Sequence, residues 1–598
     1  GASVTPEFTG DNGLVITYEV ADPEVVAVEN GAIKALAAGN TTVTASIGTA
    51  KVVLNVEVSA ASLASETTDY ELIYNSENEK SATLAVTADG VAADNAAIEW
   101  QSSAPEVVSV ENGVITALAS GEATVTASYQ GGTLEFNVTA WQGIYTTADW
   151  QSLFAVKANL SGNYKLMADI AIDSTWSANN EQVLIYDLSV YNLTGKLDGN
   201  GHTIYNITSR LFNGVVGTFE GENNTPPVTK YAEVKDLTVV TQKLGVWGGI
   251  FGYQLRGAIV DNVTAYAQFG ISLTCNDANR WGVAGAAAFS YEAPYSTIKN
   301  SNIYITVPSD MSTAAWEGGP SNTADNLYAV AEYVDNTLTI ENTNAYCHSE
   351  YDGSLTHFAG GFEMTVQPWD GVVEVATLDE LKIFGNADLD IKLMDNITID
   401  FGGTPYTTAV ISTLNKTFDG NGHTITINAA HTDGAQVSQK NLIGTISATG
   451  VLTNATILYN LTTPTGTTGI WSANFVVLYN YGTMSELDVT INLAAVGFER
   501  NSGYLSYGGT GTFTDIDVRL AGVHHGYLRP SNPDDGAEWW RAVIVNATGE
   551  AATVNNLTIH YGGHLSGITE ENVLGLLAPG YNGTVNNIVA TNVTAVAD

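Results

Sequence analysis

The residues best suited to chemistry or recognition are concentrated in one segment towards the C-terminal end of the chain. It brings together aromatic, basic and acidic side chains: Tyr527, Arg529, Asp534, Asp535, Glu538, Trp539, Trp540 and Arg541. Trp and Tyr rings stack on the C–H faces of sugars, and Arg and carboxylate groups hydrogen-bond hydroxyls; aromatic residues and Arg also anchor protein interfaces. We therefore take these residues as the candidate recognition site.

A second insertion, earlier in the chain, has related features. Trp316 and Glu317 precede Pro-Ser-Asn at 320–322, and the same tripeptide recurs at 530–532. Trp316 and Glu317 are therefore added to the candidate site. The alternative is that Trp539 and Trp540 only pack the loop onto the body of the protein, because neighbouring residues of a strand point in opposite directions.

Two enzymatic alternatives use the same segment. A polysaccharide lyase needs a basic residue beside acids that hold calcium, and Asp534 and Asp535 with a neighbouring arginine are the densest match. A glycoside hydrolase needs two opposed carboxylates, but closeness in sequence does not oppose two side chains in space. The adjacent pair His524-His525 is a weak metal motif, since no third ligand has a suitable spacing. We therefore assign no catalytic residue.

A seven-residue segment, Asp-Gly-Asn-Gly-His-Thr-Ile, occurs at 198–204 and again at 419–425. Its Asp-Gly and Asn-Gly pairs tolerate positive φ and favour a sharp corner between strands. The catalytic alternative is an acid–base pair, Asp198 with His202 in the first segment and the equivalent pair in the second. Because the whole corner is duplicated, we expect it to have a structural role.

This heptapeptide belongs to a longer repeat that relates two halves of the chain. Lys165–Ile170 matches Lys392–Ile397 ahead of each copy. Within each half, an aliphatic residue, a polar residue, an Asn, Asp or Glu and a further aliphatic strand recur, as in Val234–Val239 and Val554–Ile559. One such coil cannot bury its apolar face alone, so we expect stacked coils that share one core.

This pattern is typical of a right-handed parallel β-helix. It resembles the β-helical repeat regions with Asp-Gly-x-Gly-His turns of bacterial, Bacteroidetes-type surface proteins, and more distantly the pectate-lyase-like fold. The resemblance implies parallel strands, Asn or Asp hydrogen bonds between coils, and function carried by inserted loops. By analogy of fold alone, it also admits a lyase or hydrolase acting in the groove of the β-helix.

A second internal repeat lies near the N-terminus. Asp22–Gly31 matches Ala104–Gly113, and Gly39–Ser46 matches Gly121–Ser128 in constant register. Short alternating strands separated by Asn-Gly turns predict antiparallel sandwiches. The sequence resembles bacterial immunoglobulin-like group-2 domains, which implies a spacer that holds a working domain away from a cell surface. The first copy has no counterpart of 61–81, so we expect its opening edge to be truncated or completed by upstream chain.

The repeats together predict an all-β chain of four domains. Two Ig-like β-sandwiches occupy 1–58 and 59–140, and two tandem halves of a parallel β-helix occupy 141–368 and 369–598. Cys275 and Cys347 belong to no disulfide framework, which favours free thiols but leaves their pairing open.

The net charge of the chain argues against some classes of binding partner. Asp and Glu number 63 against 21 Lys and Arg, for a net charge of −42, which argues against nucleic acid or an anionic membrane. No apolar run reaches about 18 residues, so no transmembrane segment is expected. The carboxylates suit calcium, and no other cofactor is expected.

These features favour a non-catalytic, adhesin-like bacterial protein that binds a glycan or a surface protein. We expect it to be secreted or anchored at the outer membrane on the cell surface. A polysaccharide lyase or glycoside hydrolase is the alternative function, and a purely structural envelope component is a third.

Overall fold

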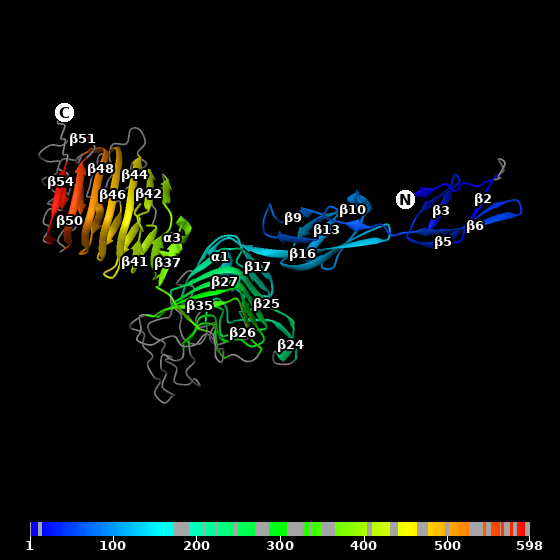
Figure 1. Ribbon diagram of the computed structural model, residues 1–598, viewed down its shortest axis with the longest axis horizontal. Helices are drawn as coiled ribbons and strands as arrows, with labels where there is room; N and C mark the ends of the chain where they lie inside the picture. The colour runs from blue at the N-terminus through cyan, green and yellow to red at the C-terminus, as the bar shows by residue number, and fades with distance from the viewer. Residues whose placement is uncertain are drawn as a thin grey trace.

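The structure is a computed structural model dominated by β-strands. It describes residues 2–9, 15–156, 158–172, 191–208, 210–221, 225–242, 249–268, 286–307, 327–333, 337–349, 365–402, 409–430, 440–462, 476–496, 502–525, 542–545, 552–561, 564–566, 575–577 and 583–591. The predicted all-β class is confirmed, with two short α-helices in these ranges, α1 (Thr147–Ser152) and α3 (Leu378–Phe384). No helix in them is long and apolar enough to cross a membrane. Figure 1 shows the elements following one another from the N-terminal sheets to the C-terminal strands.

The two N-terminal copies of the repeat are built from antiparallel sheets. The first copy contains β1 (Ser3–Val4), β2 (Thr17–Val20), β3 (Val26–Glu29), β4 (Ala32–Ala35), β5 (Gly39–Ile47) and β6 (Ala50–Val58). The second contains β7 (Leu63–Ala64), β8 (Asp69–Ile73), β9 (Ser81–Thr83), β10 (Thr87–Ala88), β11 (Val91–Ala92), a 3₁₀ turn (Asn95–Ala97), β12 (Glu99–Ser102), β13 (Val108–Glu111), β14 (Val114–Ala117), β15 (Gly121–Tyr129) and β16 (Gly132–Ile144). Asn30 and Asn112 take φ of 50° and 49° at equivalent hairpin turns, as Asn-Gly turns require.

The second copy is joined to the following strands through β16. Its first part pairs antiparallel with β15, whereas Gln142, Gly143 and Ile144 pair in parallel with the next strand along the chain. The side chain of Asn75 secures this passage, because its amide donates to the Gly143 carbonyl and its oxygen accepts from the Gly143 N–H, both at 2.8 Å. A single strand therefore links the antiparallel copy to the parallel part of the molecule.

The next strands form what we call the first stack. They are β17 (Asn163–Leu166), β18 (Ile170–Ala171), β19 (Asn192–Leu193), β20 (Lys196–Asp198), β21 (Thr203–Ile207), β22 (Gly214–Val216), β23 (Thr218–Gly221), β24 (Thr225–Lys230), β25 (Ala232–Thr241), β26 (Gln254–Arg256), β27 (Ala258–Gln268), β28 (Ala286–Ala287), β29 (Ser290–Glu292), β30 (Thr297–Lys299), β31 (Asn302–Val307), β32 (Leu327–Tyr328), β33 (Ala331–Tyr333), β34 (Thr339–Glu341), β35 (Asn344–Ser349) and β36 (Gln367–Pro368). A long sheet runs through β17, β20, β25, β27, β31 and β35, and a second sheet has the order β19-β22-β26-β29-β33. Apart from the antiparallel β23–β24 pair, the paired strands of this stack are parallel.

The remaining strands form the second stack. They are β37 (Val372–Val375), β38 (Asp390–Leu393), β39 (Ile397–Gly402), β40 (Ile411–Leu414), β41 (Thr417–Asp419), β42 (Thr424–Ala430), β43 (Ile443–Ile446), β44 (Val451–Thr462), β45 (Val477–Asn480), β46 (Thr483–Val496), β47 (Ser502–Gly508), β48 (Thr512–His525), β49 (Ala542–Val545), β50 (Thr553–Tyr561), β51 (His564–Ser566), β52 (Gly575–Leu577), β53 (Thr584–Val585) and β54 (Ile588–Thr591). Its long sheet passes through β38, β41, β44, β46, β48 and β50, and its second sheet has the order β40-β43-β45-β47-β49-β52, again in parallel.

Aliphatic side chains from successive strands of the second stack line up in one core. Five buried residues of one ladder pair in sequence and are at most 1% exposed: Ile425, Ile457, Val489, Val518 and Ile559. Each strand contributes alternate side chains to this core, as the period of two dictates. A strand shifted by one residue would expose its apolar set, so burial fixes the register.

A corner residue with positive φ recurs in both stacks, either within a strand of the long sheet or between two successive short strands. Its φ lies between 43° and 54° at Asp236, Asn262, Asn300, Asn342, Asn454, Glu486, Asp515 and Asn556. Side chains at this corner hydrogen-bond to the neighbouring coil: Asn262 donates to Asp236 at 2.7 Å and Asn556 to Asp515 at 2.8 Å. Asn and Asp suit the corner because they tolerate left-handed backbone and carry a group that reaches the next strand.

The two stacks meet through a ladder of aromatic rings. Tyr266, Tyr304 and Tyr346 occupy paired positions of successive strands, with ring centroids 5.0 Å and 4.9 Å apart and nearly parallel planes. Trp369 and Phe384, which lie at the start of the second stack, pack edge-on against Tyr304 and Tyr266 at 5.1 Å and 5.0 Å. The outer face of the first stack is thereby covered by the beginning of the second.

The ladder makes stability sensitive to alkaline pH. Burial, together with Tyr304 and the carboxylates of Glu380 and Glu374, raises the pKa of Tyr266 to about 12. The neutral phenol is favoured in the folded state, so its contribution is complete below an unfolded pKa near 10 and is lost as pH rises from about 10 to about 12. We expect Tyr266→Phe to leave the melting temperature at pH 7 nearly unchanged and to raise it relative to the native chain at pH 11. Equal alkaline losses in the two proteins would contradict this, and Tyr231→Phe, at an exposed position, is the control.

Candidate functional site

The predicted recognition residues lie outside the described residues. This holds for all ten: Tyr527, Arg529, Asp534, Asp535, Glu538, Trp539, Trp540, Arg541, Trp316 and Glu317. Their geometry therefore remains a prediction. What the structure gives is the position of the strands on either side of them.

Both predicted segments follow a strand of a long sheet, although the strands that come after them, β32 and β49, belong to different kinds of sheet. Residues 308–326 lie between β31 of the long sheet and β32, and 526–541 lie between β48 of the long sheet and β49 of the second sheet. Because the strands of each long sheet are parallel, their carboxyl ends lie along one edge of the stack. Both segments therefore begin at the carboxyl edge of a long sheet.

Connection length differs between most of the forward and return segments of the second stack. At the carboxyl edge of the long sheet, 463–475, 497–501 and 526–541 lead to the second sheet. Most returns from the second sheet are short, at 415–416, 447–450, 481–482 and 509–511, although 546–552 and 578–583 are longer than the forward connection 497–501. Long connecting segments are where binding residues concentrate in repeat folds. The carboxyl edge of the long sheets is therefore the candidate functional edge.

The heptapeptide forms a corner between strands, and in the first copy His202 contacts a residue other than Asp198. Asp198 is buried, accepts a hydrogen bond from the Asn200 N–H at 2.8 Å and forms ion pairs with Lys165 and Lys235 at 3.3 Å and 3.2 Å. His202 instead contacts Asp169, at 3.3 Å. In the second copy, Asp419 likewise accepts from the Asn421 N–H, at 2.7 Å. These contacts are those of a structural corner.

A cluster of carboxylates lies on the described part of the second stack. A shallow pocket of about 380 Å³ is lined by Glu486, Leu487, Asp488, Asp515, Ile516, Asp517, Asn556 and Thr558. Among the described residues, no group of three or more His, Cys, Asp or Glu side chains is arranged to hold a metal ion. The predicted calcium dependence therefore has no described site and remains a prediction.

Beside this pocket, three side chains form a carboxylate–imidazole–hydroxyl chain. His560 Nε2 lies 3.1 Å from Asp517 Oδ2, and its Nδ1 lies 2.7 Å from the hydroxyl of Thr591. This order of groups resembles that of a nucleophilic triad. The three residues lie on three successive strands of one ladder, β48, β50 and β54. We interpret this arrangement of Asp517, His560 and Thr591 as a contact between neighbouring coils.

The contact between Asp517, His560 and Thr591 was not predicted from the sequence, although all three residues lie in or directly after copies of the repeated motif. Asp517 lies in the repeated motif of its coil, and His560 and Thr591 directly follow the same motif in the next two. In the register of the ladder, Thr591 lies opposite His560, whereas Asp517 lies opposite Thr558 and is a diagonal neighbour of His560.

The described cysteine is poorly suited to nucleophilic chemistry. Burial raises the pKa of the Cys347 thiol to about 11, so little thiolate forms at neutral pH. Cys275 lies outside the described residues, and the pairing of the two cysteines stays open.

Comparison with known proteins adds little. No family model and no curated protein matches the chain. Among solved structures, domains 4 and 5 of the S-layer protein SbsC are 19% identical over 21% of this chain and 70% of theirs, with a TM-score of 0.12. Domains 4–9 of the same surface protein give 20% identity, a TM-score of 0.12 and coverage of 22% of each chain. The fragment rSbsC(31-844) gives 20% identity, a TM-score of 0.13 and coverage of 23% of this chain and 22% of that one. Overlaps of this size and geometry establish neither a shared fold nor a shared function.

Proposed function

We propose that this chain is a non-catalytic bacterial protein, secreted or anchored at the outer membrane, that binds a glycan or a surface protein. In this proposal, Ig-like group-2 domains at 1–58 and 59–140 are spacers. The halves 141–368 and 369–598 are a right-handed parallel β-helix whose loops carry recognition. The domain boundaries, the handedness and the family resemblance belong to the proposal.

The observation that carries the proposal is the difference between the edges of the stacks. In the second stack, the long connections 463–475 and 526–541 begin at the carboxyl ends of long-sheet strands, whereas the returns 415–416, 447–450, 481–482 and 509–511 have at most four residues. The Trp- and Arg-rich segment 526–541 is one of these long connections. An edge that carries successive long segments offers a partner a continuous surface without requiring a catalytic cleft.

The antiparallel copies support a spacer role. Each is small and has its own buried cluster, centred on Val26 and Val43 in the first and on Val108 and Val125 in the second. Strand β16 continues from the second copy into the first stack, so the spacer and the stack share one sheet. A continuous sheet fixes the position of the stack relative to the second copy more firmly than a flexible linker would.

A binding screen coupled to a product assay tests the proposal. The full chain would be applied to arrays of acidic and neutral glycans with and without calcium, and each polysaccharide that binds would be incubated with the protein and analysed for new chain ends. We expect saturable binding and no cleavage. Cleavage of a bound polysaccharide would replace the proposal with the enzymatic alternative.

The aromatic pair in the 526–541 segment should dominate this binding. We expect the double substitution of Trp539 and Trp540 by Ala to weaken binding at least about tenfold, because buried aromatic anchors carry most interface energy. Tyr481→Ala is the matched control, because Tyr481 is an exposed aromatic residue in a short return at the opposite edge. Isothermal titration of both variants against the selected ligand gives the comparison. Equal affinities would place recognition elsewhere.

The hydrolase alternative has one observation in its favour. The acidic pocket that includes Asp515 and Asp517 lies next to the His560 imidazole and the Arg519 guanidinium, which is 3.6 Å from Asp517. If the product assay detects cleavage, Asp517→Asn is the first variant to examine.

A further inference from the structure

Asn-Gly pairs form turns at two kinds of place in this fold. Asn30-Gly31 and Asn112-Gly113 close the β3–β4 and β13–β14 hairpins, whereas Asn200-Gly201 and Asn421-Gly422 lie in the two heptapeptide corners. All four Asn residues have nearly the same φ, between 49° and 52°. The four pairs therefore differ in their surroundings, and not in their own sequence or in the φ of the Asn.

An Asn followed by Gly can undergo a reaction that needs only water. The main-chain nitrogen of the Gly attacks the side-chain carbonyl carbon of the Asn, a C–N bond forms, and the side-chain nitrogen leaves as ammonia with the proton of the main-chain N–H. Water then opens the five-membered imide at either carbonyl and leaves aspartate or isoaspartate. Gly favours the attack because no Cβ shields its nitrogen. The reaction requires that the Gly nitrogen and the Asn amide can approach each other.

In the heptapeptide corners both reacting groups are held by neighbouring coils. The Asn200 side-chain amide donates to the Leu166 carbonyl at 3.2 Å, and the Gly201 N–H donates to the Asp236 carbonyl at 2.9 Å. The equivalent two hydrogen bonds of the second corner measure 3.0 Å and 2.8 Å. Attack by the Gly nitrogen would break both hydrogen bonds of a corner. The fold therefore protects these two pairs.

In the hairpins neither reacting group is held. Within the described residues, the side-chain amides of Asn30 and Asn112 have no hydrogen-bond partner, and the N–H groups of Gly31 and Gly113 have no acceptor. Both Asn residues are exposed. The last ladder pairs flank each two-residue loop, so the N–H groups of the loop are not part of the ladder. The hairpin pairs therefore have the freedom that the reaction requires.

The turn of the second copy is nevertheless restrained at its glycine. Gly113 is buried, and a Cβ at this position would touch the side chain of Asn95. The Gly113 carbonyl accepts from the Leu84 N–H at 2.7 Å, and the Asn95 amide donates to the Leu84 carbonyl at 2.9 Å. The peptide groups of this turn can therefore move little.

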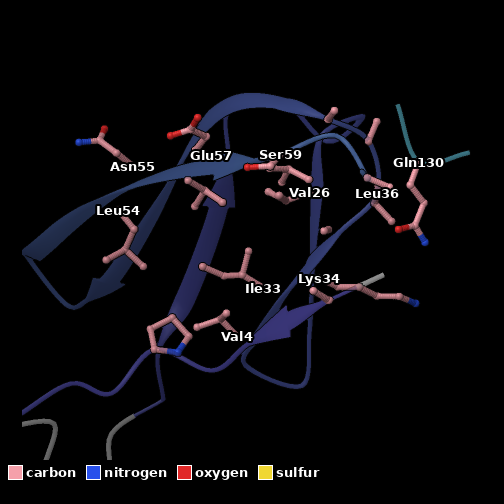
Figure 2. A pocket seen from close by; sticks show the side chains of 18 of the residues that line it. Val4, Val26, Ile33, Lys34, Leu36, Leu54, Asn55, Glu57, Ser59 and Gln130 are labelled. Carbon is pink, nitrogen blue, oxygen red and sulfur yellow. The ribbon is translucent and has the colours of Figure 1, made fainter. Parts of the chain in front are cut away.

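The turn of the first copy lacks this restraint. Strands β1 and β4, which carry Val4 and Ile33 in Figure 2, pair in the register of β9 and β14. This register puts Pro6 at the position whose N–H holds the glycine carbonyl in the second copy, and proline has no N–H to donate. At Gly31, the one atom that approaches the place of a Cβ is the Tyr18 hydroxyl oxygen, 4.0 Å away. The first turn is therefore the least restrained of the four.

We propose that Asn30 is a site of spontaneous deamidation, at which the Gly31 nitrogen closes the imide and water opens it to aspartate or isoaspartate. Either product adds a negative charge next to Glu29. Isoaspartate also adds one carbon to the main chain of the turn, and a two-residue loop does not absorb it without losing the Glu29–Ala32 pair. The modification therefore weakens the β3–β4 hairpin and leaves the stacks unchanged. It is independent of the proposed function.

Peptide mapping of the full chain by mass spectrometry tests the proposal. One sample is incubated folded in mildly alkaline buffer, and a second is incubated in the same buffer with urea. The replacement of ammonia by water is read as a mass increase, and chromatography separates isoaspartate from aspartate peptides. In urea we expect similar rates at all Asn-Gly pairs, because each reaction then depends only on the Asn and the Gly after it.

In the folded sample the rates should separate in a fixed order. We expect Asn30 to react first and Asn112 at least about threefold more slowly. Asn200 and Asn421 should react at least about tenfold more slowly than Asn30, because two hydrogen bonds must break. Asn213, which also precedes a Gly but is 0% exposed, is the buried control and should stay intact.

A variant at the proposed site tests the consequence for the fold. Asn30→Gln keeps the charge, and its longer side chain would have to close a less favourable six-membered ring. We expect this variant to stay unmodified and to keep slow hydrogen exchange in β3 and β4 throughout the incubation. The native chain should lose that protection in proportion to the isoaspartate that it forms.

Three outcomes would overturn the proposal. In the first, Asn30 stays intact in the folded chain over a period in which the urea sample converts it. In the second, Asn200 or Asn421 reacts in the folded chain as fast as Asn30. In the third, exchange in β3 and β4 accelerates equally in the native chain and in Asn30→Gln, which would assign the loss of protection to a cause other than the modification.

Discussion

Replacing Gly420 by alanine is expected to lower the free energy of unfolding of the second stack by about 3 kcal/mol, because the site has no room for a side chain. A Cβ at this position would touch the Ala455 Cβ and would lie 2.6 Å from the Asn454 carbonyl oxygen. Both belong to the next coil, so the main chain itself must move. Urea unfolding followed by circular dichroism measures the loss.

The same heptapeptide supplies the matched control. Gly422 has a φ of 74°, and no atom lies within 4 Å of the place that a Cβ would take, so alanine there meets only backbone strain. We expect Gly422→Ala to cost about 1–2 kcal/mol. Equal losses for the two variants would show that the coils do not approach as closely as described. Gly199→Ala repeats the test in the first stack, where a Cβ would lie 2.6 Å from the Leu237 Cα.

Trp150→Ala is expected to destabilise the first stack by about 3–5 kcal/mol, the cost of deleting a fully buried indole. Trp150 is 0% exposed, and its ring packs against Phe154 and Phe212 with centroids 5.8 Å and 5.9 Å away. It is carried by α1, which lies at the start of the stack. Removing the ring opens a cavity that the surrounding strands cannot close.

Two companion variants separate packing from other effects. Trp150→Phe keeps an aromatic ring and removes an indole N–H that has no hydrogen-bond acceptor among the described residues, so it should cost far less than alanine. Tyr145→Ala, at a position 38% exposed, controls for loss of a surface aromatic. Denaturant midpoints of the three proteins give the comparison. A Trp150→Ala midpoint equal to that of Tyr145→Ala would contradict the assignment of Trp150 to the core.

The all-β class and the corner positions could be predicted from sequence because both depend on local rules. Asn-Gly pairs favour positive φ from their own chemistry, and Asn30, Asn200 and Asn421 adopt it. The Asp-Gly pairs of the heptapeptides, at 198–199 and 419–420, do not. Aliphatic residues at alternate positions all point to the same face of the sheet, because successive side chains of a strand point to opposite faces. Neither rule requires knowledge of distant residues.

The short helices were not predicted, although the sequence marks them. Thr146 with Asp149, and Thr377 with Glu380, form capping boxes at the starts of α1 and α3. Each helix follows a Trp-x-Gly sequence, which occurs at 141–143 and at 369–371. Their shortness hid them, because six or seven residues give too little helical periodicity to recognise.

Contacts between coils could not be predicted from local pattern. Asp517 and His560 are adjacent only because β48 and β50 pair in one register, and the Tyr266 ladder meets Phe384 only because the second stack covers the first. The candidate residues of 526–541 lie outside the described residues, so their arrangement stays a prediction.

Hydrogen–deuterium exchange of the full chain, with and without the ligand selected by the binding screen, tests the central claim most directly. The account predicts slowed exchange at the carboxyl ends of β31 and β48 and in the connections 308–326 and 526–541, with the ligand recovered intact. Slowed exchange confined to the acidic pocket at Asp515 and Asp517, accompanied by a cleaved ligand, would contradict it.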